Sequence, residues 1–280
     1  VAVSPDGRQV WVAAYLGEKV FALDPATGVS IPILLQVGPS PYNPFDQPSG
    51  VAVTADGSAA YISSEKNSSV VVASTAGVPQ VTAIIIDNRI KNPVAVATNP
   101  VRPEAYVVNG KNSIAVLDTV TNTVTHEITG FDTPNAIAVS ADGKYAYVTD
   151  GGANTLTLID LSGRTVLDTL TQLDTPTSVA VYAGRNQAYV TNFNGGTLAV
   201  IDTSNETLAL DQTVAGFDTP ASIAVTAGGV VYVTHGDKNG GDKNGKVSVV
   251  AVKDGTAGGK GGAGGRGGSI GQPSPQFGDG

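Results

Sequence analysis

The sequence contains 280 residues, with a net charge of −8, 41% hydrophobic residues and no cysteine. Without cysteine, a thiolate zinc site, an iron–sulfur cluster, a cysteine nucleophile and a disulfide framework are excluded. The acidic balance disfavours attraction to phosphate backbones, so we expect no nucleic-acid partner. No apolar run approaches the about 18 residues of a membrane span, and the stretch VTAIIID at 81–87 has the length of a strand.

An apolar triplet followed by a turn recurs along the chain at intervals of 42 to 50 residues. The six copies are VAVSPDG from Val1, VAVTADG from Val51, VAVATNP from Val94, IAVSADG from Ile137, VAVYAGR from Val179 and IAVTAGG from Ile223. Nine to twelve residues after each start stands an aromatic residue, namely Trp11, Tyr61, Tyr106, Tyr147, Tyr189 and Tyr232. A period of this length predicts a repeat architecture. The aromatic residues, one per repeat, are expected to pack between neighbouring repeats.

The fourth copy shows what one repeat contains. The alternating stretches AIAVS, YAYVT and TLTLID are separated by the turns ADG and DGGAN, and RTVLDTL follows the turn LSG. Asp-Gly between alternating stretches predicts a tight hairpin turn with positive φ angles. Each repeat is therefore predicted to be a four-stranded antiparallel sheet. Such sheets bury both faces when they stack around an axis, so we predict an all-β, six-bladed β-propeller over residues 1–254.

The two ends of the repeat region differ from its middle. The sixth repeat has three predicted strands, the last being VSVVAV at 247–252, so the sixth blade is predicted to be incomplete. A closing strand or a seventh blade upstream of Val1 would each account for this, and both remain open. Residues 255–280 are rich in glycine and poor in apolar side chains, so we expect a disordered, low-complexity tail.

Several motifs carry a resemblance to a known family. YVTN stands at 189–192, with YVTD from Tyr147, YVTH from Tyr232 and YVVN from Tyr106 in the same register. Together with VAVSPDG, this pattern resembles the YVTN-type β-propeller repeat proteins of bacterial and archaeal surfaces. The resemblance implies a scaffold that hosts surface-layer proteins and lactonase-like enzymes alike, so it does not settle function. The tail resembles the glycine-rich segments of mycobacterial PGRS proteins in composition.

The turns that lead into the innermost strands are candidates for a site at the mouth of the central channel. Five residues before each of these strands stand Asp46, Arg89, Asp132, Asp174 and Asp218. A ring of carboxylates would favour a cation or a basic ligand. The competing interpretation is that each aspartate, two residues before a proline, caps its own turn.

The loops between the second and third strands share this face. Asn192, Asn194 and His235 are candidate ligand-binding residues there. Asp237, Asn239 and Asp242 lie in a longer loop, but their spacing departs from the calcium-loop pattern and no glutamate follows, so a tolerated surface insertion is the simpler interpretation. We therefore predict neither a metal site nor a cofactor.

Two functions of different class follow. The first is a non-catalytic binding or structural propeller that presents a loop face to a small-molecule ligand or a protein partner, and it is favoured because catalytic signatures are few. The second is a lactonase- or lyase-like enzyme, or a sensor, that uses the mouth carboxylates and His235. We expect a monomer located outside the cell or in the cell envelope. Because the sequence begins without methionine, we expect any signal segment to lie outside it.

Overall fold

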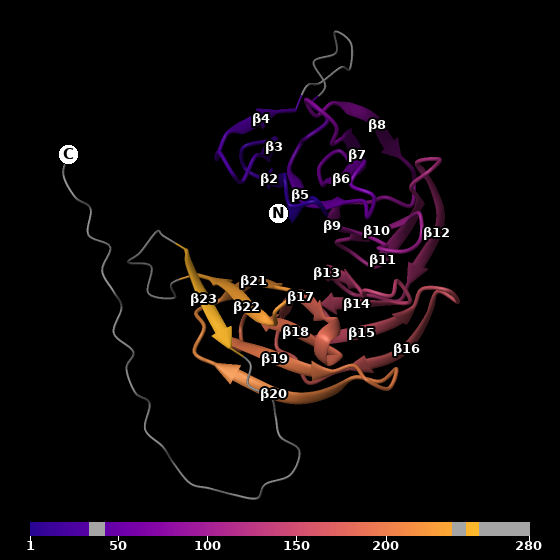
Figure 1. The fold of residues 1–280 in the computed structure, drawn as a ribbon. Coiled ribbons are helices and arrows are strands. Elements are labelled where there is room, and N and C mark those ends of the chain that lie inside the picture. The colour runs from indigo at the N-terminus through magenta and orange to yellow at the C-terminus, as the bar shows by residue number, and fades with distance from the viewer. Residues whose placement is uncertain (34–42, 237–244, 252–280) are drawn as a thin grey trace, which may run out of the picture.

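A computed structural model describes residues 1–33, 43–236 and 245–251 of the chain. These residues form six antiparallel sheets that follow one another around a central axis, which Figure 1 shows as an arc of blades from indigo to yellow. Five sheets have four strands and the sixth has three. The prediction of an all-β, six-bladed propeller with an incomplete last blade is confirmed. The predicted glycine-rich tail lies outside the described residues.

Each blade uses consecutive strands. Blade 1 contains β1 (Ala2–Val3), β2 (Val10–Ala14), β3 (Lys19–Leu23) and β4 (Ser30–Pro32); blade 2 contains β5 (Pro48–Val53), β6 (Ala59–Ser64), β7 (Ser69–Ser74) and β8 (Val81–Ile86). Blade 3 contains β9 (Pro93–Thr98), β10 (Glu104–Asn109), β11 (Ser113–Asp118) and β12 (Thr123–Thr129). Blade 4 contains β13 (Pro134–Val139), β14 (Tyr145–Asp150), β15 (Thr155–Asp160) and β16 (Thr165–Leu170). Blade 5 contains β17 (Pro176–Tyr182), β18 (Gln187–Asn192), β19 (Thr197–Asp202) and β20 (Ala209–Ala215), with a 3-10 turn at Ala183–Arg185, and blade 6 contains β21 (Pro220–Val225), β22 (Val230–His235) and β23 (Lys246–Ala251).

The innermost strands of blades 2 to 6 all begin at a proline. Proline fits the first position of a strand because it has no N–H to donate to the ladder. In blade 4 the pairing shifts directly after this residue, because Pro134 faces Asp150 whereas Ala136 faces Thr149. The same shift follows Pro176 and Pro220. At this bulge the side chains of Asn135 and Thr177 reach the next blade, where they donate to the carbonyls of Pro176 and Pro220.

The Asp-Gly hairpin turns differ from the expected geometry. In the turn from Ser140, Gly143 donates its N–H to the Ser140 carbonyl at 2.9 Å. Gly143 has a φ of 69°, whereas Asp142 is not among the residues with positive φ. Asp142 instead accepts the Ser140 hydroxyl and the N–H of Lys144 through its side chain. The aspartate therefore fixes the turn by hydrogen bonds, and only the glycine supplies the left-handed conformation.

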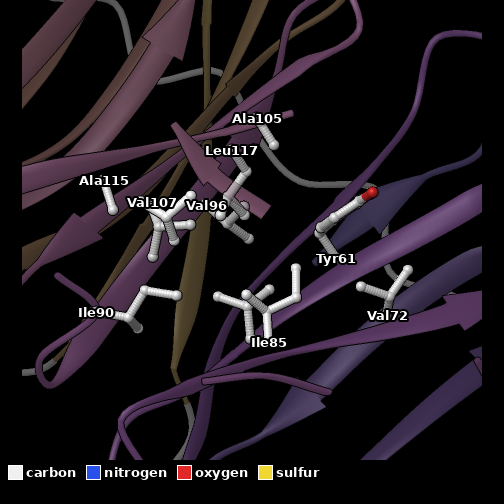
Figure 2. Packing of buried hydrophobic residues seen from close by; sticks show 11 residues of the cluster. Tyr61, Val72, Ile85, Ile90, Val96, Ala105, Val107, Ala115 and Leu117 are labelled. Atoms are coloured by element: carbon white, nitrogen blue, oxygen red, sulfur yellow. The ribbon is translucent and has the colours of Figure 1, made fainter. Parts of the chain in front are cut away.

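The core consists of one apolar layer at each junction between blades. Figure 2 shows the layer between blades 2 and 3, where Tyr61 and Val72 of blade 2 lie beside Val96, Ala105 and Leu117 of blade 3. The aromatic residue of the second strand is buried in each of blades 1 to 5, as predicted. In blade 6 the prediction is wrong, because Tyr232 is exposed. No helix among the described residues is long and apolar enough to cross a bilayer.

Replacing Tyr189 by alanine tests the packing between blades. Tyr189 is fully buried against Ile223 and Val231 of blade 6. We expect Tyr189→Ala to lower the free energy of unfolding by about 3 to 5 kcal/mol, as for other large aromatic residues removed from a core, measured by denaturant titration. Phe193, exposed beyond the end of the same strand, is the control, and Phe193→Ala should cost less than about 1 kcal/mol. Equal costs for the two variants would contradict the packing.

Candidate functional site

The turns at the predicted channel mouth are held by the side chain that ends each second strand. In blade 4, Asp150 accepts the N–H of Asp132 at 2.6 Å and that of Thr133 at 2.9 Å. It also accepts the N–H groups of Gly152 and Ala153 at 3.2 and 3.0 Å. The Asp150 carboxylate is buried, so its lone pairs are satisfied by backbone donors from two different turns.

Asparagine has the same role in the neighbouring blades. Asn109 accepts the N–H of Lys91 at 2.9 Å and donates to the carbonyl of Arg89 at 2.7 Å. Asn192, the asparagine of YVTN and a predicted ligand-binding residue, is buried and accepts the N–H of Asp174 at 3.4 Å. The residue that ends the second strand therefore links two turns of one blade. We call this side chain the clamp; it is Asn109 in blade 3, Asp150 in blade 4 and Asn192 in blade 5.

The turns before the prolines also contain an unusual backbone conformation. Gln47, Asn92, Thr175 and Thr219 have φ between 44° and 53°. A left-handed residue other than glycine costs about 1 to 2 kcal/mol. In blade 5 the carbonyl of Thr175 accepts the N–H of Phe193 at 2.9 Å, and its own N–H donates to Asn154 of blade 4 at 2.8 Å. These two bonds offset the cost and fix the turn.

The four predicted mouth aspartates do not share one environment. Asp132 and Asp174 are exposed, Asp218 is half-buried, and Asp46 forms an ion pair with Lys66 at 3.2 Å. The turn-cap interpretation needs a correction, because the backbone N–H of Asp132 is the group that is capped and Asp150 supplies the cap. Among the described residues no group of three or more histidine or acidic side chains could hold a metal. Ligand binding at the mouth stays a prediction.

Arg89, the cation of the predicted ring, is turned toward the outer strand of the next blade. Its guanidinium donates to both oxygens of Asp87, at 2.8 and 2.7 Å, and to the carbonyl of Val124 at 2.7 Å. Hydrogen bonding to Arg89 lowers the pKa of Asp87 to about 2. The charge of Arg89 is therefore directed to its own turn and to β12.

The remaining candidates lie in the loops after the second strands. Asn194 donates to the hydroxyl of Thr175 at 2.7 Å, which ties this loop to the neighbouring turn. His235 bonds through Nε2 to Ser248 at 2.8 Å and meets the Phe217 ring edge-on at a centroid distance of 5.8 Å. Its Nδ1 atom is buried without a hydrogen-bond partner. Asp237, Asn239 and Asp242 lie outside the described residues.

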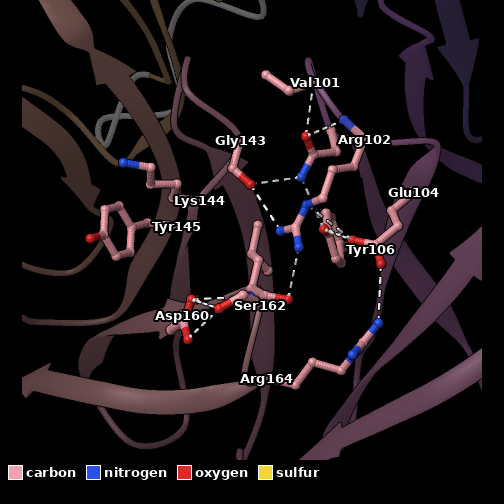
Figure 3. A network of polar contacts seen from close by, with 12 residues as sticks. Val101, Arg102, Glu104, Tyr106, Gly143, Lys144, Tyr145, Asp160, Ser162 and Arg164 are labelled. Atoms are coloured by element: carbon pink, nitrogen blue, oxygen red, sulfur yellow. Dashed lines mark hydrogen bonds and ion pairs between the residues drawn. The ribbon is translucent and has the colours of Figure 1, made fainter.

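A second polar site lies on the opposite face, where the turns after the first and third strands gather. Figure 3 shows its base between blades 3 and 4. The Arg102 guanidinium donates to the carbonyls of Gly143 and Leu161 at 2.9 and 3.3 Å and lies 3.6 Å from Glu104. Glu104 also pairs with Arg164 at 3.1 Å. Two arginines around one carboxylate hold the base of the site rigid.

Tyr106 and Asn99 complete this network from within blade 3. The Tyr106 hydroxyl donates to Glu104 at 2.6 Å, and Asn99 donates to that hydroxyl at 3.1 Å and to the carbonyl of Gly143 at 2.9 Å. Burial, and then the hydrogen bond to Glu104, raise the pKa of Tyr106 well above its ordinary value. The phenol therefore stays a neutral donor at physiological pH.

Above this base is a hollow of about 560 Å³, which we call the turn-face groove. Its lining consists of Val101, Arg102, Asp142, Gly143, Lys144, Tyr145, Asp160, Ser162, Leu167 and Glu206. Exposed carbon surface comes from Val101 and Leu167, and the side chains of Lys144 and Asp142, 70% and 50% exposed, form an ion pair at 3.7 Å on the rim. The volume falls in the range of ligand pockets. A second hollow of about 460 Å³ follows between blades 2 and 3 on the same face.

One wall of the groove combines a tyrosine with carboxylates. The Tyr145 hydroxyl donates to the carboxylate of Glu206, which comes from the next blade. This hydrogen bond, followed by desolvation and by the nearby charges of Asp142 and Asp160, raises the pKa of Tyr145 to about 12. The wall is therefore acidic, while Arg102 and Lys144 carry positive charge beside it.

Sequence reasoning missed the turn-face groove. One signal was available: the third repeat replaces the Asp-Gly turn by NPVRPE, which places Arg102 and Glu104 where the other repeats have a short turn. Their partners could not be found in this way, because Arg164 lies about one and a half repeats further along the chain. Only the stacking of blades brings them together.

The fold and its repeats define a β-propeller repeat protein, and the comparisons with known proteins agree with this class. A family model described as the LVIVD repeat matches residues 135–175, which span one blade. Hydrazine synthase from Kuenenia stuttgartiensis is similar in structure, with a TM-score of 0.57 and 17% identity over 90% of this chain and 94% of that one. In all, 1637 solved chains match this structure, so the fold alone does not indicate a particular activity. No curated protein matches the sequence.

The clamp can be tested by comparing two aspartates of blade 4. Asp150→Ala removes a buried acceptor that is shared by four N–H groups of two turns, so we expect the free energy of unfolding to fall by about 1 to 3 kcal/mol or more. Asp132→Ala removes an exposed carboxylate and should change it by no more than about 0.5 kcal/mol. Thermal or denaturant unfolding measures both. A larger loss for Asp132→Ala would show that the cap runs in the other direction.

The pair of Asp87 and Arg89 predicts a dependence on pH. Because the pKa of Asp87 is lowered in the folded state, its contribution to stability is present above its ordinary pKa and is lost as the pH falls toward about 2. We expect Arg89→Gln to lower the free energy of unfolding by about 0.5 to 1 kcal/mol at pH 7 and by less at pH 2. Lys91→Gln, which removes an exposed cation from the same turn, is the control. A deficit equal at both pH values would argue against the ion pair.

Proposed function

We propose that this chain is a non-catalytic binding propeller, displayed outside the cell or in the cell envelope, that holds a protein partner on one turn face. The observation that carries the proposal is the turn-face groove. Its base is fixed by Arg102, Glu104 and Arg164, while Lys144 and Leu167 are exposed above it. A rigid polar base below an accessible rim with apolar, tyrosine and charged groups is the composition of a protein-binding surface.

The shape and charge of the groove favour a short peptide segment as the bound element. Val101, Tyr145 and Leu167 offer carbon surface, and Asp160 and Glu206 add acidity along the wall, whereas Asp142 is paired with Lys144. A peptide with an apolar side chain beside a lysine or arginine matches both features. The net charge of −8 favours basic partners in the same sense.

The mouth supports binding chemistry less well. The deepest polar side chains there, Asp150, Asn109 and Asn192, are bonded to the backbone of their own blades. Their hydrogen-bonding capacity is thus used to fix turns, which leaves Asp132 and Asp174 as exposed carboxylates on a rigid rim. The proposed location rests on the sequence: the resemblance to surface propeller repeats, the absence of cysteine and the glycine-rich extension.

A selection of random peptides displayed on phage against the 280-residue chain tests the binding function. We expect the selected peptides to combine apolar and basic residues, and to bind Leu167→Asp at least about tenfold more weakly, a loss of about 1.4 kcal/mol. Leu16→Asp introduces the same change at an exposed leucine in blade 1 and should leave the affinity unchanged. Fluorescence anisotropy of labelled peptides measures the dissociation constants.

Two results would contradict the proposal. Peptides that bind Leu167→Asp and the unchanged chain equally would place binding elsewhere. Hydrolysis of a panel of lactones by the unchanged chain, lost in both Asp132→Ala and His235→Ala, would show that the chain is an enzyme with its site at the mouth.

A further inference from the structure

Every junction between described blades is built from two different faces. One blade presents its second-strand aromatic residue with two apolar residues of its third strand, which we call the aromatic face. The next blade presents small and β-branched residues of its first three strands, which we call the valine-rich face. At the junction of blades 5 and 6, Tyr189, Leu198 and Val200 pack on Ile223 and Val231. At the junction of blades 1 and 2, Trp11 and Val20 pack on Val51 and Val53 in the same manner.

Both kinds of face occur once more, exposed, at the two ends of the arc. On blade 6, Tyr232 is 40% exposed, and Val247 and Val249 are each 63% exposed. The register pairs Tyr232 with Val249, as it pairs Tyr189 with Val200 in blade 5, where both are fully buried. The second and third strands of blade 6 therefore carry the same kind of apolar residues as those of blade 5, but expose them.

Blade 1 presents the matching face of the other kind. Val1 and Val3 are 80% and 56% exposed, whereas Val51 and Val53, their equivalents in blade 2, are 8% and 9% exposed. Figure 1 shows the arc of blades open between the sheet of β21–β23 and the sheet of β1–β4. The two exposed apolar faces thus lie at the two sides of one opening in the ring. Exposed apolar patches of this kind mark interaction surfaces.

We infer that these two faces form one docking surface for a seventh four-stranded blade of the same repeat pattern, carried by further polypeptide of the same chain. Such a blade has an aromatic face that matches Val1 and Val3 and a valine-rich face that matches Tyr232 and Val249. A ligand or a single strand could cover one side of the opening, but a sheet that is apolar on both faces covers both sides. Linkage within one chain is chosen because all five described junctions join blades that are consecutive in sequence.

The test extends the 280-residue chain by a copy of a blade whose packing is known. Residues 134–178, which include blade 4 and the proline segment that follows it, are placed directly before Val1. Hydroxyl-radical footprinting with mass spectrometry then measures the oxidation rate of Tyr232 in both chains. We expect the rate for Tyr232 to fall in the extended chain to that of Tyr147, whose exposed fraction is 3%, and hydrogen exchange of β1 and β23 to slow.

The control changes only the exposed aromatic face of blade 6. Val249 is exposed in the 280-residue chain, and Val249→Asp should therefore leave the stability of that chain unchanged. In the extended chain the same substitution should prevent docking, so Tyr232 should be oxidised as fast as in the 280-residue chain. A second extended chain, with residues 176–222 of blade 5 in place of the blade 4 copy, guards against a copy that fails to fold.

Three outcomes would overturn the inference. The first is that neither appended blade protects Tyr232, whether or not it folds. The second is that Tyr232 is already protected in the 280-residue chain at every concentration, which would mean that blade 6 closes directly on blade 1. The third is protection that grows with protein concentration and with sedimentation mass, which would identify a second copy of the chain as the occupant.

Discussion

A small β-sheet that is apolar on both faces cannot be stable alone, and the whole structure follows from this constraint. Both faces of β6, β10, β14 and β18 are buried, so each of these blades needs a neighbour on either side. The hydrophobic layers carry the stabilisation, and the antiparallel ladders satisfy the backbone within each blade. Stacking around an axis is the arrangement that supplies two neighbours to every interior sheet.

Polar side chains supply the hydrogen-bond partners that the turns between stacked blades need. Turns that lie against the next blade are partly buried, so their N–H groups need acceptors. Asp150, Asn109 and Asn192 provide these acceptors from the end of the second strand, and Asn135 and Thr177 donate across the junction to Pro176 and Pro220 at 3.0 and 3.1 Å. The polar residues that recur from repeat to repeat therefore stabilise the fold and do not by themselves indicate a binding site.

The architecture could be predicted from the sequence because it is periodic. Alternation along the strands, the Asp-Gly turns and the regular aromatic residues each indicate the same four-stranded unit. The direction of a hydrogen bond is not encoded in such a pattern: the offset of Asp132 suggested a capping side chain, whereas its backbone N–H is the donor. Arg89 shares that offset, yet Asp87 two residues earlier determines where it points.

The turn-face groove shows a different limit. It arises where one repeat departs from the others, at Arg102 and Glu104, and where blades bring Arg164 and Glu206 beside them. Its members come from three blades, so no local window of sequence contains them. Tyr232 illustrates the same point for packing, because its sequence context matches that of Tyr189 and only the presence or absence of a neighbouring sheet decides its exposure.

The unequal faces of each junction give the ring a direction. Because the aromatic face of one blade always meets the valine-rich face of its successor, the contact is head-to-tail, and any blade can in principle follow any other. The loss or duplication of a whole repeat would then recreate a junction of the same kind, whereas an insertion of half a repeat would leave a sheet with too few strands to present either face in full. In this architecture the number of blades is set by the angle between successive sheets, and the complete repeat is the unit by which such a protein can grow or shrink without losing its core.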